Sequence, residues 1–104
     1  MGKVKITVVK KSCMKEFQEK YGHEELGKTC PYFNEGDEFI VDSGSITVPN
    51  GFCKSAWIDI ARNVYALMLG GNFRDWKWVK DENIGIVCCA DGLRPVFFKI
   101  EKIK

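Results

Sequence analysis

Apolar and polar residues alternate in the first segment, where Val4, Ile6 and Val8 each follow a lysine or a threonine. This period of two predicts a half-buried strand. Three further β-rich runs occupy residues 38–42, 84–90 and 95–103. Asp91-Gly92 separates the last two runs and is a strong hairpin signal. The pattern therefore predicts four strands, the last two forming a C-terminal hairpin.

A short helix is expected after the first strand. Met14, Phe17 and Tyr21 fall on one helical face, Ser12 is a plausible N-cap, and Gly22 can end the helix. Residues 22–36 and 43–53 carry the glycines, prolines and polar clusters of irregular segments.

The main helix is predicted from about Ser55 to Leu69 and is ended by Gly70-Gly71. Its apolar stripe is formed by Trp57, Ile60, Ala61, Val64 and Met68, widened by Ile58, Tyr65 and Leu69. The element order is then β-α-β-α-β-β. We expect a single α+β domain over residues 1–104, with two helices packed on a mainly antiparallel sheet.

Composition places the chain among ordinary globular domains. It has 104 residues, of which 45% are hydrophobic and 29% are charged, and its net charge is +2. No apolar run is long enough for a bilayer, and no secretory cleavage site follows the lysine-rich start, so a cytoplasmic protein without a membrane partner is expected. The lysines of that start predict a solvated edge strand. Nucleic acid is an unlikely partner at this charge, although those lysines with Trp76 and Trp78 define an RNA-binding alternative.

Five cysteines are an odd number, which argues against a complete disulfide framework. None forms a Cys-x-x-Cys pair, so folding would have to assemble any metal site. Cys30, Cys53 and Cys89 lie at loop or element ends, from which separate segments can converge. We expect these three to line one pocket and to bind a soft metal such as zinc, to hold an iron–sulfur cluster, or to act as reactive thiols.

Two local arguments favour particular thiols. A two-residue turn at Asp91-Gly92 would place Cys89 opposite Arg94, whose guanidinium favours a thiolate. Cys53 directly precedes the main helix, whose positive end favours the same form. The alternative for every cysteine, including Cys13 and Cys88, is simple packing as a small hydrophobe. His23 is the sole histidine and is expected to be an exposed surface residue.

Three stretches resemble a small prokaryotic family of uncharacterised single-domain proteins of similar length. They are Cys30-Pro31 leading to Phe33, Gly36 and Phe39-Ile40-Val41; Pro49, Gly51-Phe52-Cys53, Ala56-Trp57 and Ile60; and Cys89-Ala90-Asp91-Gly92-Leu93-Arg94-Pro95-Val96 followed by Phe98-Lys99-Ile100-Glu101. The resemblance covers nearly the whole chain and implies no activity, substrate or catalytic residue. It does place Cys30, Cys53 and Cys89 inside family-like motifs.

The leading hypothesis is a small binding or redox-accessory protein in which Cys30, Cys53, Cys89 and Arg94 surround a ligand, a soft metal or a reactive thiolate. A homo-oligomeric interaction module that uses the aromatic residues of segment 72–79 is the main alternative. No triad motif, P-loop or dinucleotide fingerprint is present, and a cysteine enzyme is a weaker alternative because the sequence shows one histidine and no recognisable base.

Overall fold

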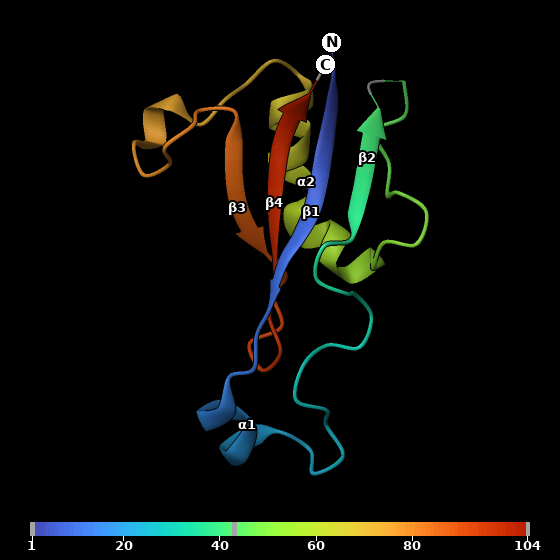
Figure 1. Cartoon of the computed structure of the whole chain (residues 1–104), viewed down its shortest axis with the longest axis vertical. Coiled ribbons are helices and arrows are strands. Elements are labelled where there is room, and N and C mark those ends of the chain that lie inside the picture. The colour runs from blue at the N-terminus through green and yellow to red at the C-terminus, as the bar shows by residue number, and fades with distance from the viewer. Residues whose placement is uncertain (1, 43, 104) are drawn as a thin grey trace.

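The computed structural model describes residues 2–42 and 44–103 and confirms the predicted α+β fold (Figure 1). Its elements follow the predicted order, with one extra 3-10 turn. They are β1 (Lys3–Lys11), α1 (Lys15–Tyr21), β2 (Glu38–Asp42), α2 (Lys54–Met68), η1 (Arg74–Trp76), β3 (Ile84–Cys88) and β4 (Val96–Ile103).

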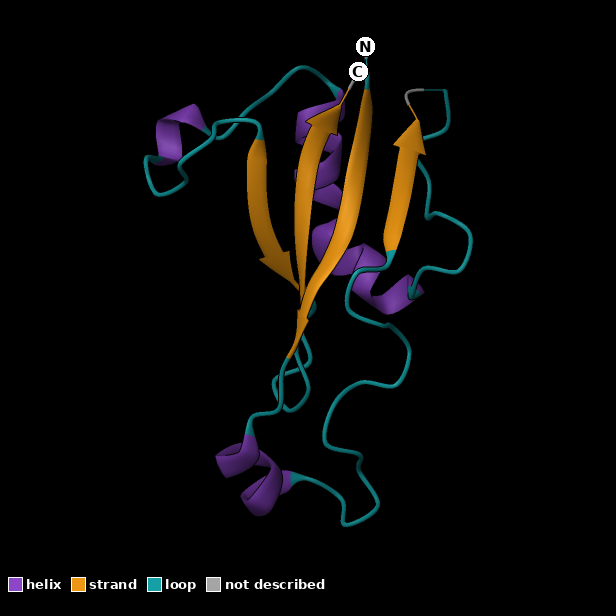
Figure 2. Ribbon diagram, viewed as in Figure 1, coloured by secondary structure: helices purple, strands orange, loops and turns teal. Residues whose placement is uncertain are grey.

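The four strands form one antiparallel sheet in the order β2-β1-β4-β3. The first and last strands of the chain are therefore the two central ones, and both chain ends lie at the same end of the sheet (Figure 1). Helix α2 covers one face of the sheet (Figure 2) and contacts β1, β3 and β4. The edge-strand expectation for the lysine-rich start was wrong, because β1 pairs on both sides.

Lysines of β1 lie instead on the open face of the sheet. Lys5 is 3.6 Å from Glu38 on β2 and 3.8 Å from Glu101 on β4, so it links three strands. Lys3 pairs with Asp42 at 3.9 Å. Opposite charges on neighbouring strands favour this strand order, although each exposed pair contributes little on its own.

Alternate residues of the central strands form the core beneath α2. Val4, Ile6 and Val8 of β1 are at most 1% exposed. β4 contributes Val96, Phe98 and Ile100, and α2 contributes Ala56, Ile60, Val64, Leu67 and Met68, all of them buried. Burial of large apolar side chains is the main favourable term in folding such a small domain.

The buried face of α2 is rotated from the predicted stripe. Ile58 is 78% exposed and Leu69 is 68% exposed, so neither widens the core face. Tyr65 is also exposed, and its hydroxyl donates to the carbonyl of Ile46. The error arises because the main helix is apolar on more than half of its circumference, so periodicity alone does not fix which residues face the sheet.

Helix α1 lies beyond the end of the sheet, beside the β3–β4 loop (Figure 1). The prediction that Ser12 caps the short helix was wrong. The N–H of Ser12 donates to the carbonyl of Pro95, so the chain continues along β4 before α1 begins at Lys15. None of the residues of α1 is buried. The Gln18 side-chain amide donates to the carbonyls of Leu93 and Lys28, at 2.8 and 3.0 Å, and so ties α1 to two loops.

The ring of Phe73 packs directly against the backbone of Gly85 on β3. A Cβ atom at residue 85 would lie 2.6 Å from Cε2 of Phe73, which is closer than packed atoms tolerate. Phe73 is itself buried, so its ring has little room to retreat.

We predict that Gly85→Ala lowers the free energy of unfolding by about 1–3 kcal/mol, the usual cost of overpacking. Urea denaturation followed by tryptophan fluorescence measures this change. Gly92→Ala is the matched control, because a Cβ there has no atom within 4 Å and stability should not change. Equal stability of the two variants would contradict the packing described here.

Candidate functional site

A pocket of about 530 Å³ opens where three segments meet: the loop before β2, the first turns of α2, and the β3–β4 loop. We call it the thiol pocket, because Cys30, Cys53 and Cys89 all line it. Its remaining lining residues are Pro31, Tyr32, Phe33, Ser55, Ala56, Asp59, Ala90, Asp91, Arg94 and Val96. The structure therefore brings together the three cysteines and the arginine singled out in the sequence.

Aromatic packing explains why two of these segments meet. The ring centroids of Phe33 and Phe52 are 5.1 Å apart, and both rings also contact Phe98 of β4 at 5.3 Å. Cys30 precedes Phe33 by three residues, and Cys53 directly follows Phe52. Ring packing in the core thus holds Cys30 and Cys53 at the rim of the same pocket.

Backbone pairing places the third cysteine. The N–H of Cys89 donates to the carbonyl of Val96 at 3.2 Å, and the N–H of Val96 donates to Sγ of Cys89 at 3.4 Å. The second bond holds the sulfur at the pocket wall. Val96 lies two residues before Phe98, so the same core also positions Cys89.

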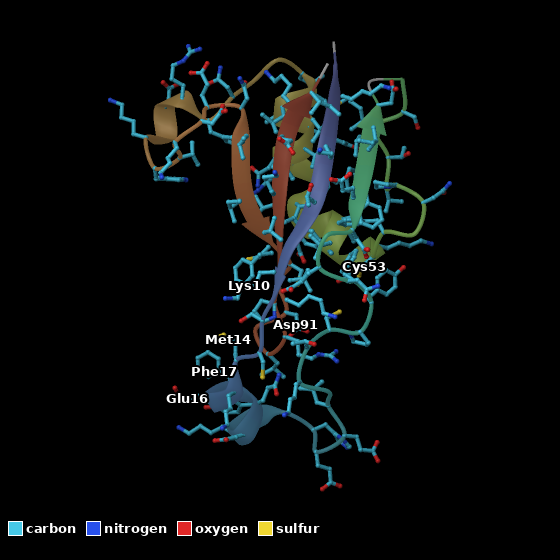
Figure 3. The ribbon with its side chains drawn as sticks, viewed as in Figure 1. Lys10, Met14, Glu16, Phe17, Cys53 and Asp91 are labelled. Carbon is cyan, nitrogen blue, oxygen red and sulfur yellow. The ribbon has the colours of Figure 1, made fainter. Side chains whose placement is uncertain are left out.

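Cys53 occupies the N-cap position of α2, where Figure 3 labels it. It makes no side-chain capping bond, and the first turn of α2 contains no acidic residue. Backbone N–H groups at a helix start carry a partial positive charge. Because Cys53, Ser55 and Ala56 all line the thiol pocket, that end of α2 contributes to its wall.

The predicted two-residue turn at Asp91-Gly92 was wrong. Val87 pairs with Phe98 and Cys88 with Phe97, so residues 89–95 form a longer loop. The Asp91 carboxylate accepts the N–H groups of Leu93 and Arg94, and Pro95 has no N–H to donate. These side-chain hydrogen bonds to the loop backbone replace the cross-strand backbone hydrogen bonds that a two-residue turn would have continued.

Arg94 therefore does not lie opposite Cys89, although both line the pocket. Its Nε is 3.7 Å from the Asp91 carboxylate, an ion pair rather than a hydrogen bond. That Nε is buried and has no hydrogen-bond partner among the residues that the structure describes. A buried donor without a partner is costly, and the negative charge of the nearby Asp91 carboxylate offsets part of that cost.

Asp59 is a pocket residue that the sequence did not reveal. Its carboxylate accepts the N–H of Ala90 at 2.8 Å and so ties α2 to the β3–β4 loop. The helical pattern placed Asp59 on the polar side of the main helix. Its spacing of four from Ser55 was the available signal, because residues four apart share one face.

The three cysteines are not arranged as a metal centre. In residues 2–42 and 44–103, no group of three or more His, Cys, Asp or Glu side chains is placed so that it could hold a metal ion. Thiolate ligands of one zinc ion must each lie about 2.3 Å from it. The expectation of zinc or an iron–sulfur cluster at Cys30, Cys53 and Cys89 gains no support from this geometry.

The remaining candidate residues lie outside the thiol pocket. Cys13 is half-buried and Cys88 is exposed on β3. His23 is exposed, and its Nδ1 accepts the N–H of Glu25. It does not line the thiol pocket, so the pocket cysteines have no histidine partner there.

Two alternative functions were expected from the sequence: an interaction module that uses the aromatic residues of segment 72–79, and RNA binding by the N-terminal lysines with Trp76 and Trp78. Trp78 is 72% exposed, whereas the side chain of Trp76 falls outside what the structure describes. Lys3 and Lys5, which the RNA-binding alternative requires, already pair with carboxylates. Both alternatives remain predictions.

Comparisons with family models, with curated proteins and with solved structures returned no match. The family resemblance seen in the sequence therefore stays a prediction. The described helices include none with the length and apolar character needed to cross a membrane.

Cys88 titrates differently from an ordinary thiol. Cys88 is exposed as a residue, but partial burial of its thiol raises the pKa above its ordinary value of 9.0, and neighbouring Cys89 and Asp59 raise it further. The unfolded chain therefore releases this proton at a lower pH than the folded protein does. The stability that the protonated thiol contributes is complete at pH values below the pKa of the unfolded state. It is lost as the pH rises through the higher pKa of the folded state.

We predict that Cys88→Ser reduces the loss of stability between neutral pH and pH values above 9.0. Serine is close in size and does not titrate in this range, so the two proteins differ mainly in this one proton. Urea denaturation of wild type and variant across that range measures the effect. Parallel pH profiles would show that Cys88 has no such role.

Proposed function

We propose that the protein binds a small molecule in the thiol pocket and presents reactive thiols to it. The observation that carries this proposal is the convergence of Cys30, Cys53 and Cys89, from three remote segments, on one open cavity. Its volume is within the range of ordinary small-molecule sites.

The lining supports a ligand with both apolar and polar parts. Phe33, Ala56 and Val96 are buried and give the pocket an apolar floor. Arg94 adds a positively charged guanidinium group to the pocket lining. A few polar groups around an apolar floor are typical of sites that orient a small ligand.

The three pocket cysteines pack against the core and also line the open cavity. All three are intermediate in exposure, whereas the core side chains are at most 3% exposed. Reactive cysteines need this access, and buried structural ones are inert. Unbridged thiols also support the expected cytoplasmic setting, where thiols stay reduced.

Blocking the pocket with a bulky side chain tests the proposal. Ser55 is exposed at the rim, so Ser55→Trp should narrow the opening without disturbing the core. We predict that iodoacetamide then alkylates Cys30, Cys53 and Cys89 several-fold more slowly than in wild type. Peptide mass spectrometry of timed samples measures the rate at each cysteine.

Cys13 and Cys88 are internal controls in this experiment, because they lie outside the pocket. Lys54→Trp is the matched variant: it places the same side chain one residue away, at an exposed position that does not line the pocket. It should leave all rates close to wild type. Equal slowing of all five cysteines, or no slowing in Ser55→Trp, would rule out a shared pocket.

A further inference from the structure

The thiol pocket holds several thiols and has no histidine to act as a general base among its described lining residues. The only histidine of the chain, His23, lies elsewhere, and the pocket carboxylates of Asp59 and Asp91 accept backbone N–H groups. Thiol–disulfide exchange is a reaction that cysteines perform without such a base, because a thiolate attacks a disulfide sulfur directly. Exchange therefore needs no reacting group beyond the thiols that line the pocket.

We propose that the thiol pocket reduces small disulfides, with Cys30 and Cys53 as the exchanging pair. This inference rests on the proposed binding of a small molecule in the pocket. It adds the class of that molecule, a low-molecular-weight disulfide, and the fate of its sulfur–sulfur bond.

The choice of pair follows from the aromatic contact beneath it. Phe33 and Phe52 are in ring contact, and they anchor the two segments that carry Cys30 and Cys53. Cys89 differs, because its sulfur accepts a hydrogen bond from the Val96 N–H. Cys30 lies on the segment without helix or strand between α1 and β2, and Cys53 lies at the start of α2, so two separate segments supply the pair.

Two successive exchanges complete the reaction. The Cys53 thiolate attacks one sulfur of R–S–S–R, that bond breaks, and R–S⁻ leaves as Cys53–S–S–R forms. The Cys30 thiolate then attacks Sγ of Cys53 and releases the second R–S⁻. The cysteines lose two electrons and two protons, and the small disulfide gains them to become two molecules of R–SH.

The test uses the full chain with Cys13→Ser and Cys88→Ser, treated with 2-hydroxyethyl disulfide under anaerobic conditions. This probe is neutral, so the outcome does not depend on the charges of the pocket. We expect release of two thiol equivalents per chain, no retained adduct, and a Cys30–Cys53 bridge in non-reducing peptide maps. Native mass spectrometry should show a monomeric product that dithiothreitol converts back.

Single substitutions in this background separate the roles. Cys30→Ser should stop at a stable mixed disulfide on Cys53, whereas Lys54→Trp, the control outside the pocket, should still form the bridge. A persistent adduct on the parent chain, a bridge that uses Cys89, or a bridge between chains would overturn the inference. The proposed binding function would survive any of these results if Ser55→Trp still shields the three pocket cysteines from iodoacetamide.

Discussion

The contact between Phe33 and Phe52 is the interaction on which the site depends. These rings come from two irregular segments, and each also packs against Phe98 at the centre of the sheet. Aromatic pairs of this kind contribute roughly 0.5–1.5 kcal/mol beyond the area they bury. Phe39 of β2 joins this cluster, because its ring centroid lies 5.0 Å from that of Phe52.

The pocket follows from how each segment is held. The start of α2 is rigid because the helix packs on the sheet through Ala56 and Ile60. The β3–β4 loop is fixed by Asp59 and by the internal bonds of Asp91, and α1 supports it through Gln18. Loops positioned by a rigid scaffold are a common place for binding groups. Here they present the thiols of Cys30, Cys53 and Cys89 to one cavity.

The period of apolar residues predicted the buried face of an element correctly where the opposite face is clearly polar. The strand at Val4, Ile6 and Val8 was predictable because its alternation is clear, and so was the end of α1 at Gly22. The orientation of α2 was not, because Ile58 and Leu69 look as apolar as the residues that are buried. Strand order was not predictable either, since it depends on contacts between distant segments.

The candidate site also has parts that the sequence predicted and parts that it did not. The choice of Cys30, Cys53 and Cys89 came from their position at element ends, and the structure places all three on one pocket. The pairing of Cys89 with Arg94 failed because Asp91 bonds to the loop backbone, a competition that alternation does not reveal. Asp59 was overlooked because its partner, the N–H of Ala90, is a backbone group on another element.

Cross-linking with dibromobimane, which fluoresces when it bridges two nearby thiols, tests the central claim most directly. In the chain with Cys13→Ser and Cys88→Ser, the account predicts rapid fluorescence from bridged pocket cysteines in the folded protein. Adding Phe33→Leu should slow it while the sheet persists by circular dichroism. Two results would contradict the claim that aromatic packing brings these sulfurs together around one cavity. One is fluorescence that develops no faster in the folded chain than in urea, and the other is an unchanged rate in the Phe33→Leu variant.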